Sequence, residues 1–414
     1  MEAAAGGVHV TGTTESMWRI VLQSRVAESV RLRLGDPFHA RDERSLAQRL
    51  EALPWEQCLD LGSGFLRPLV RASSVSSRLY HTGLLEDLAS AAIERRASGT
   101  PPEASAEPLE VRLQLRHDEC QVSVSASGQL YQRGYRKAVG DAPLRETLAA
   151  ACVLTSPLLR RLTVAEHSDE ELVVWDPFCG SGVLLLEALG IALGDPPGDR
   201  HRRYPFASFP DHDPAAFDAV ADALLPTPHP AVGRLRLLGS DASEEQIERS
   251  RRNLWRCARR TESEGKREPC ALPCSVDFHH GPLARVAQGL RGRPTMILTN
   301  LPYGILSGGR RTKRGQKEAF EAYAQLGRIL RSQATWRGVY CLAADPDELR
   351  HHTGAEWTNE MRFFHGGIWV NLLQWAGIST SSAHPSTLRR GFRATSGIIR
   401  DVDVGVRDQR RVRR

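Results

Sequence analysis

Two short stretches of the chain combine residue types that can do chemistry. The first is a carboxylate followed by a glycine-rich turn, Asp176-Pro177-Phe178-Cys179-Gly180-Ser181-Gly182. The second is an amide followed by an aromatic ring, Asn300-Leu301-Pro302-Tyr303. The first comes directly after the apolar run 172–175, and the second follows the run 295–298 and Thr299; such runs are found in strands that are buried on both faces. We therefore expect both stretches at the carboxyl ends of strands in one sheet, where open α/β sheets bind ligands.

The glycine turn has the features of a nucleotide site. Gly180 and Gly182 lack a Cβ, so the backbone can turn sharply and a ligand can lie against it. A dinucleotide fold needs a small residue where Leu185 stands, and a phosphate-binding loop needs a lysine that is absent here. A carboxylate before the turn suits S-adenosylmethionine, which carries an ammonium and a sulfonium but no phosphate. An ordinary strand–helix turn is the structural alternative.

A second carboxylate, Asp241, ends the next apolar run, 235–239. In this position it can accept hydrogen bonds from both ribose hydroxyls, and it can also cap the helix that is predicted to follow. The predicted cofactor-binding residues are Asp176, Phe178, Cys179, Gly180, Ser181, Gly182 and Asp241.

The second stretch suits the methylation of an exocyclic amine. Such an amine is a weak nucleophile because its lone pair is delocalised into the ring. Asn300 Oδ1 and the Leu301 carbonyl can accept its two N–H bonds, and Tyr303 can stack on a flipped base. The sulfonium is a good leaving group, so positioning supplies much of the catalysis. We expect Asn300, Leu301, Pro302 and Tyr303 to form the catalytic site, the alternative being a strand-end turn with a packed tyrosine.

Periodicity predicts the elements around these stretches. Helices are expected at 18–34, 46–53 and 84–93, and a hairpin at 111–124, which together make a small α+β module. Further strands are expected at 275–278 and 338–342, with a two-strand end of the sheet at 361–375. A long insertion, 194–233, includes a predicted helix at 214–225. The last residues, 387–414, carry a net charge of +6, equal to that of the whole chain.

The segment between module and sheet carries a resemblance. Arg133-Gly134-Tyr135-Arg136, followed by the run 142–150 (APLRETLAA), resembles the signature that joins a THUMP RNA-binding domain to a class I methyltransferase domain. The chain is similar, over residues 7–375, to the THUMP-containing half of the K/L family of bacterial large-subunit rRNA guanine-N2 methyltransferases. The strand and helix that should precede residues 6–12 (GGVHVTG) are missing from the similarity, so an N-terminal truncation is expected. The family's adenine-contacting acid is replaced by Pro282.

The resemblance implies an α/β fold, with a Rossmann-like seven-stranded class I methyltransferase domain behind an N-terminal α+β THUMP-like domain. The expected boundaries are 1–128 for the RNA-binding domain, 129–155 for a connecting segment and first helix, 156–377 for the methyltransferase domain, and 378–414 for a disordered basic tail. It implies guanine-N2 methylation of RNA, with rRNA as the first choice and tRNA as the second. A catalytically silent RNA-binding protein of the same fold is the remaining alternative, favoured by Pro282 and Leu301.

Basic residues near the two stretches are the predicted RNA contacts. Five cations lie within 308–317, beside the second stretch; an isolated run of this kind is more often a solvated surface, but its position favours phosphate contact. The predicted RNA-binding residues are Arg310, Arg311, Lys313, Arg314, Arg133 and Arg136.

Composition bounds the remaining possibilities. No apolar run reaches the roughly 18 residues of a membrane span, and the first residues lack a signal-peptide pattern. Eight cysteines scattered through 414 residues indicate reduced thiols and an intracellular protein, cytoplasmic if bacterial, nuclear or organellar if eukaryotic. Cys270, Cys274, His279 and His280 are better explained by a loop leading into a strand than by a zinc site. We expect neither a membrane nor a metal as a partner.

Overall fold

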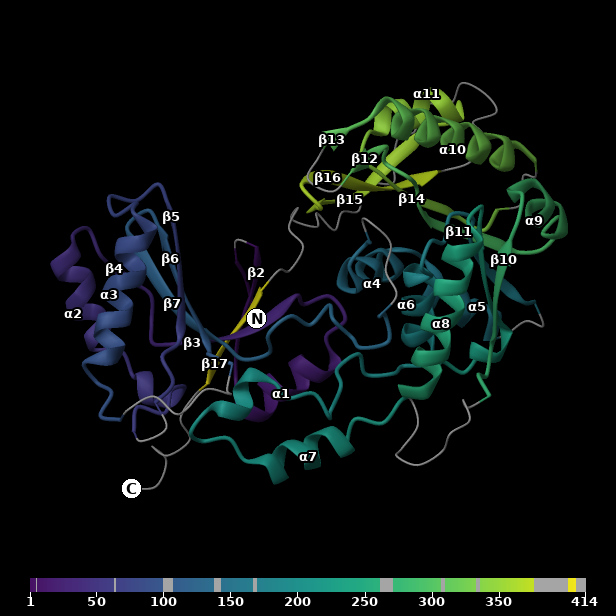
Figure 1. Ribbon diagram of the computed structural model, residues 1–414. Helices are drawn as coiled ribbons and strands as arrows, with labels where there is room; N and C mark the ends of the chain where they lie inside the picture. The colour runs from purple at the N-terminus through teal and green to yellow at the C-terminus, as the bar shows by residue number, and fades with distance from the viewer. Residues whose placement is uncertain are drawn as a thin grey trace. The chain divides into compact units, whose positions relative to one another are not determined.

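The computed structural model describes residues 1–4, 6–62, 65–99, 107–137, 143–166, 170–260, 271–306, 310–332, 336–375 and 401–406. The chain divides into two compact units (Figure 1). The N-terminal unit comprises Met1–Leu130, Gly198–Leu224 and Ile399–Arg414, and the C-terminal unit comprises Tyr131–Pro197 and Leu225–Ile398. This division differs from the contiguous boundaries expected from the sequence, because part of the insertion and the end of the chain belong to the N-terminal unit.

The N-terminal unit is built on an eight-stranded sheet of order β1-β2-β17-β3-β7-β6-β5, with β4 paired to β7. Its strands are β1 (Glu2–Ala4), β2 (Gly7–Gly12), β3 (Ser29–Arg33), β4 (Phe38–His39), β5 (Leu69–Val75), β6 (Glu110–Arg116), β7 (Glu119–Ser125) and β17 (Asp401–Val406). Its helices are α1 (Thr14–Gln23), α2 (Glu43–Glu51), α3 (Thr82–Glu94) and α7 (Pro214–Asp222).

Sequence patterns account for most of these elements. In β6 the side chains of Val111, Leu113 and Leu115 alternate into the apolar core, and β6 pairs with β7 as the predicted antiparallel hairpin. The helix predicted over 18–34 is wrong in its second half. Helix α1 ends at Gln23, capped at Ser24, and β3 begins at Ser29. Val30 and Leu32 have the two-residue spacing of a strand, which explains the difference.

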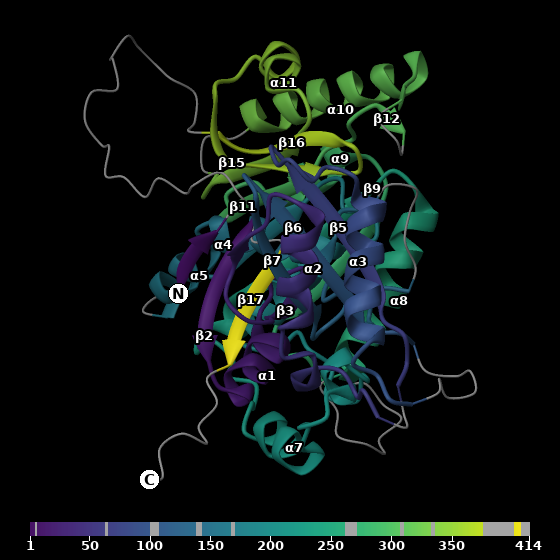
Figure 2. The same ribbon diagram turned by 90° about the vertical axis from the view of Figure 1, so that its left-hand side faces the viewer.

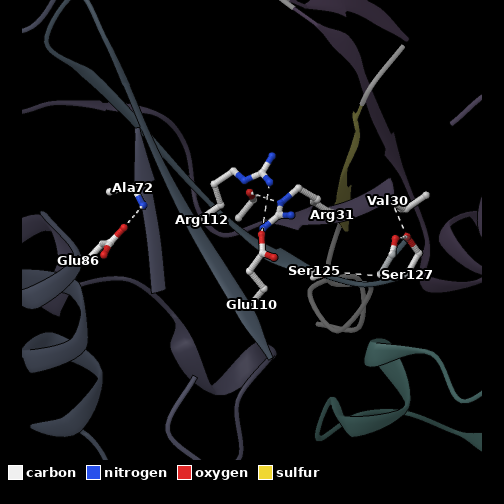
Figure 3. Close-up of polar contacts among 10 residues, drawn as sticks. Val30, Arg31, Ala72, Glu86, Glu110, Arg112, Ser125 and Ser127 are labelled. Carbon is white, nitrogen blue, oxygen red and sulfur yellow. Dashed lines mark hydrogen bonds and ion pairs between the residues drawn. The ribbon is translucent and has the colours of Figure 1, made fainter. Parts of the chain in front are cut away.

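Hydrogen bonds and ion pairs connect the strands and helices of this unit (Figure 3). Arg31 is 3% exposed, and it reaches Ser123 through a 3.1 Å hydrogen bond from Nε and Glu110 through an ion pair of 3.0 Å. Glu86 on α3 accepts a 3.0 Å hydrogen bond from the Ala72 amide on β5. The guanidinium of Arg31 therefore links β3 to both strands of the β6–β7 hairpin.

The insertion contributes an aromatic cluster to this core. Trp18 of α1 meets Phe217 of α7 edge-to-face, with ring centroids 5.7 Å apart, and lies 6.2 Å from Phe206. The backbone of the insertion lies very close to α1 at Gly198, where an added Cβ would be only 2.5 Å from the Leu22 Cα. The predicted helix in the insertion is present as α7, and it packs on α1.

The end of the chain also enters this sheet. Strand β17 lies between β2 and β3 and is parallel to both (Figure 2, yellow). Its residues pair with the whole of β2, from Asp401 opposite Gly7 to Val406 opposite Gly12. The expectation of a disordered tail is therefore wrong for 401–406. The rest of the tail, 378–400 and 407–414, lies outside the described residues.

The C-terminal unit contains a seven-stranded sheet of order β10-β9-β8-β11-β14-β16-β15, in which β16 runs antiparallel to both of its neighbours. Its strands are β8 (Leu172–Asp176), β9 (Leu235–Asp241), β10 (Ser275–His280), β11 (Thr295–Asn300), β14 (Val339–Ala343), β15 (Trp357–His365) and β16 (Ile368–Trp375). A separate hairpin joins β12 (Ile305–Leu306) to β13 (Arg310–Arg311).

Helices cover both faces of this sheet. One face packs against α4 (Glu146–Thr155), α5 (Leu158–Glu166), α6 (Val183–Ala192) and α8 (Glu244–Arg260). The other packs against α9 (Leu283–Gly289), α10 (Lys313–Ser332) and α11 (Pro346–Thr353). Within the described ranges, no helix alone is long and apolar enough to cross a membrane; α4 and 158–165 of α5 pass that test only as a pair bent by 52°.

Strand β17 generates a first prediction. In a chain that ends at residue 400, the facing edges of β2 and β3 lose their shared partner, so the β1–β2 hairpin loses its connection to the rest of the sheet. We expect the amides of 7–12 to exchange with solvent about tenfold faster or more, while those of β5 and β6 keep their protection. Hydrogen–deuterium exchange measures this, and a chain that ends at 406 is the matched control. Equal exchange in the two chains would contradict the pairing.

Candidate active site

A buried carboxyl group lies at the carboxyl end of β8, between β9 and β11 in the C-terminal unit's sheet. Asp176, at the end of β8, is 1% exposed. Its Oδ1 accepts a 2.6 Å hydrogen bond from Thr299 Oγ1 on β11 and a 3.1 Å bond from the Phe178 amide. Burial raises the pKa of Asp176 to about 7, against the lowering effect of these two donors. The carboxyl group is therefore poised between its two protonation states near neutral pH.

The glycine turn after β8 is held by a second carboxylate. Asp241, at the end of β9, accepts hydrogen bonds from the amides of Gly180 at 3.0 Å and Ser243 at 2.9 Å. Gly180 has φ 51° and Gly182 has φ 83°, a region that favours glycine. A Cβ on Gly180 would meet nothing within 4 Å, whereas one on Gly182 would press on Phe278 at 3.1 Å. A side chain at position 182 would therefore press on the protein interior, whereas the space beside Gly180 is open.

The other two predicted turn residues are directed into the protein. Cys179 belongs to the apolar core beneath the turn, and burial raises the pKa of its thiol well above the usual value, so it stays protonated and unreactive. Ser181 is buried; its Oγ accepts a 3.2 Å hydrogen bond from Arg136 Nε and its carbonyl accepts one of 3.1 Å from Asn253 Nδ2. Both side chains support the turn.

A cavity of about 870 Å³ opens at the carboxyl ends of β8, β9 and β10. Phe178, Ala242 and Pro282 line it, together with residues of α9 and α10. This volume is within the range of small-ligand pockets. The cavity wall therefore includes Phe178 of the turn after β8, Ala242, which follows Asp241, and Pro282.

The second predicted stretch is at the end of β11. Asn300 Oδ1 accepts a 2.5 Å hydrogen bond from the Tyr303 hydroxyl, and Leu301 is buried, with its amide donating to the Leu342 carbonyl at 3.2 Å. Pro302 is exposed. Burial raises the pKa of Tyr303 well above its usual value, so the phenol remains a neutral hydrogen-bond donor. Because Thr299 precedes Asn300, its bond to Asp176 ties this stretch to the glycine turn.

Two residues predicted to bind RNA are buried. Arg133 pairs with Glu187 of α6, and the two side chains are 2% and 1% exposed. Tyr135 donates a 2.6 Å hydrogen bond to the same carboxylate, and the Arg136 guanidinium, 3% exposed, lies 3.5 Å from Glu146. The assignment of Arg133 and Arg136 as RNA contacts is wrong, because neither guanidinium reaches the surface; both fix the segment before α4 onto the C-terminal unit.

The basic segment after Tyr303 is described in part. Arg310 and Arg311 form β13, which pairs with β12, while 307–309 lie outside the described residues. Lys313 and Arg314 begin α10 and are exposed, and Arg314 pairs with Glu318 at 2.9 Å. Among the residues that the structure describes, no group of three or more His, Cys, Asp or Glu could hold a metal ion. Cys270 lies outside this part.

Several supporting residues escaped the sequence interpretation. Thr299 donates to Asp176, and Ser250 Oγ donates a 2.7 Å hydrogen bond to the Gly180 carbonyl. Each is an isolated hydroxyl residue that belongs to no recognisable sequence motif. Glu187 had a signal, because it is the one charged residue in the apolar helix α6. A lone acid in such a helix predicts a buried cationic partner.

These features define a class of protein. Five parallel strands followed by an antiparallel pair, with the glycine turn after the central strand and an acid at the end of the next, are the fold of class I methyltransferases. The family described as RMKL-like, methyltransferase domain, matches residues 133–366. The chain belongs to this family, whose members use S-adenosylmethionine.

Three relatives illustrate the likeness. Ribosomal RNA large subunit methyltransferase K/L of Psychromonas ingrahamii is 27% identical over 372 residues, which are 88% of this chain and 45% of the relative, so the chain spans about half its length. A predicted N6-adenine-specific DNA methylase from Listeria monocytogenes is 24% identical, with a TM-score of 0.67 and coverage of 89% and 87% of the two chains. SMU.472, described as a methyltransferase and solved with SAH (S-adenosylhomocysteine), is 22% identical, with a TM-score of 0.64 and 89% coverage of both chains.

The two solved structures show the fold alone at these identities, and their coverage includes the N-terminal unit. The expected fold, a class I methyltransferase domain with an N-terminal α+β THUMP-like region, is confirmed. The recognition of the K/L family from the residues around Arg133 and Gly180 is confirmed as well.

Asp176 generates a second prediction. In the unfolded chain it loses its proton near pH 4, whereas in the folded protein it keeps the proton up to about pH 7. The unfolded state therefore binds fewer protons in this interval, and the contribution of Asp176 to the free energy of unfolding falls as the pH rises from 4 to 7. Asp176→Asn keeps an acceptor for Thr299 and Phe178 without the charge. We expect the ligand-free variant to be more stable than the wild type at pH 8, by up to roughly 4 kcal/mol.

Urea unfolding of both proteins at pH 5 and pH 8 measures this difference. Parallel changes with pH in the two proteins would show that Asp176 does not titrate in this range.

The buried ion pair generates a third prediction. Arg133→Met leaves the Glu187 carboxylate buried without its cation, which costs roughly 3–5 kcal/mol of unfolding free energy. Arg252→Met removes a cation from an exposed pair with Glu248 and should cost less than about 1 kcal/mol. Denaturant unfolding gives both values. A stable Arg133→Met protein with weakened RNA binding would restore the RNA-contact role.

Proposed function

We propose that this chain is an S-adenosylmethionine-dependent RNA methyltransferase that methylates N2 of a guanine in large-subunit rRNA. One observation carries the proposal, the 2.6 Å hydrogen bond between Thr299 Oγ1 and Asp176 Oδ1. It holds Asn300, the residue that would accept the amine hydrogens, at a fixed distance from the glycine turn that would hold the methyl donor. If residues 300–303 formed only a turn that ends β11, the preceding Thr299 would not need a hydrogen bond to a buried carboxyl group.

The described geometry supports S-adenosylmethionine as the cofactor. The open space above Gly180 lets a ligand lie on the backbone, and the adjoining cavity is large enough for the adenosine. Asp241 would accept the ribose hydroxyls, and the carboxylate form of Asp176 would favour the cationic methionine end. When bound, S-adenosylmethionine supplies an electrophilic methyl group on a sulfonium.

The residues at the end of β11 would orient the amine. Asn300 Oδ1 and the Leu301 carbonyl would accept its two N–H bonds and direct the nitrogen lone pair at the methyl group. The Tyr303 hydroxyl donates to Asn300 Oδ1, and the second lone pair of that oxygen would accept the amine hydrogen. A phenol with so high a pKa does not act as a base, which agrees with catalysis by positioning.

The choice of guanine in rRNA rests on the similarity to the K/L enzyme over 88% of this chain. The N-terminal unit would bind the RNA as a THUMP-like domain covering about residues 1–128. Register places Arg33, Ser123, Arg112 and Arg71 in one row across the sheet, on the face opposite the apolar core. Arg33 pairs with Asp36 and Arg112 with Glu110, and the exposed Arg71 would contact the phosphate backbone. Residues 129–155 would connect this domain to the methyltransferase domain.

Methyl transfer to purified RNA tests the proposal. The full chain is incubated with labelled S-adenosylmethionine and with deproteinised rRNA, precursor particles or tRNA, and the RNA is digested to nucleosides for mass spectrometry. We expect label in N2-methylguanosine from large-subunit rRNA. Label in tRNA alone, or in N6-methyladenosine, would overturn the substrate. RNA binding without any methyl transfer would identify a catalytically silent RNA-binding protein.

Asn300 and Tyr303 generate a fourth prediction. Asn300→Ala removes the amine acceptor and should lower the single-turnover rate by ~10²–10³ while cofactor affinity holds. Tyr303→Phe removes the hydroxyl that donates to Asn300 and keeps the stacking ring, so its rate should stay within about tenfold of the wild type. Tyr303→Ala should lose ~1–3 kcal/mol of base binding.

Rapid-quench kinetics and calorimetry with S-adenosylmethionine separate the two effects. Wild-type rates in folded Asn300→Ala protein would place methyl transfer elsewhere.

A further inference from the structure

We propose that a groove on α10 is a stacking site for a nucleotide that neighbours the target base in single-stranded RNA. Lys313, Lys317, Phe320 and His352 line it, with a volume of about 460 Å³. A nucleobase stacks against the Phe320–His352 pair, and its phosphates lie at the two lysines. The inference rests on the proposed function in one respect, because it takes the residues after β11 as the place where the target base binds.

The aromatic floor of the groove is already arranged for stacking. The rings of Phe320 on α10 and His352 on α11 are 4.2 Å apart at centroids and 22° from parallel. Both side chains are partly exposed, so an added base extends an existing stack. Base–aromatic stacking tolerates any base because every base has a π-face. The groove therefore suits a flanking nucleotide whose identity is not read.

The cations lie along the same side of α10. Lys313, Lys317 and Phe320 are spaced four and three residues apart, so they form one stripe on the helix and span roughly 10 Å. Glu321 also lines the groove and lies 3.9 Å from Lys317, whose side chain is 80% exposed. An exposed pair of this kind contributes little, so a phosphate can replace the carboxylate as the lysine's partner.

The helix that carries the groove contacts the backbone that follows Tyr303. A Cβ on Gly304, the residue after Tyr303, would lie 2.8 Å from the Gly315 carbonyl oxygen. A Cβ on Gly315 would in turn lie 3.0 Å from the Gly304 carbonyl oxygen. The backbone after Tyr303 thus rests directly on the first turn of α10, which carries Lys313 and Gln316 into the groove. The backbone that follows Asn300 and Tyr303 is therefore in contact with the helix that carries the groove, as an RNA strand occupying both places would require.

The experiment measures binding of a short fluorescent single-stranded RNA by the full chain, with a matched oligonucleotide that lacks its bases and with heparin as a base-free polyanion. Phe320→Leu keeps an apolar side chain for packing but removes the π-face. We expect it to bind the RNA about tenfold more weakly, with unchanged affinity for the abasic strand and for heparin. Its unfolding midpoint is measured to establish that it is folded.

The lysines are tested separately from the ring. Lys313→Ala/Lys317→Ala should lower the slope of log K against log salt by about 1.4, since each phosphate contact with a single strand contributes ~0.7. Arg252→Ala, which removes an exposed cation from α8, is the charge control and should leave the slope unchanged. Calorimetry with S-adenosylmethionine should give wild-type affinity for every variant.

The outcomes separate this inference from the proposed function. Equal losses for RNA, abasic strand and heparin in Phe320→Leu, or no loss at all, would overturn stacking and leave a surface that recognises charge only. An unchanged salt slope in the double lysine variant would overturn the phosphate contacts. Base-dependent binding at Phe320 in a protein that transfers no methyl group would uphold the groove while the proposed function fails.

Discussion

The active site depends on one hydrogen-bonded carboxyl group between two parallel strands. Asp176 ends β8 and Thr299 precedes the last residue of β11, and their 2.6 Å bond joins the glycine turn to the turn that contains Asn300. In a buried environment such a bond is stronger than in water, and a broken one costs more. The relative position of the two turns is therefore set by a bond inside the protein, away from solvent.

Two other carboxylates complete this support. Asp241 holds the amide of Gly180, and Glu187 anchors the segment around Arg133 and Tyr135 beneath the same turn. Each carboxylate receives several donors, which offsets the cost of its burial. The glycine turn is therefore held by hydrogen bonds to the protein, while the space beside Gly180 stays open. A ligand that entered this space would bind without a rearrangement of the turn.

The sequence predicted the parts of the site that follow from local order along the chain. Apolar runs that lead to Asp176, Asp241 and Asn300 indicated buried strands, and all seven predicted strands of the C-terminal sheet are present. Arg133 was misassigned because its signature contains two arginines, which suggest an RNA contact. Its actual partner, Glu187, is 54 residues further along the chain and cannot be identified from the local sequence. Strand β17 could not be predicted, since its pairing with β2 joins the two ends of the chain.

The path of the chain between its two compact units has a consequence for synthesis. The backbone leaves the N-terminal unit after Leu130, returns for Gly198–Leu224, leaves again, and returns with β17. The segment Met1–Leu130 therefore cannot complete its sheet until β17 has been synthesised. The strands described in the C-terminal unit all lie at or before residue 375, so its seven-stranded sheet can close earlier. Folding would then finish at the N-terminal unit, in the reverse of the usual vectorial order.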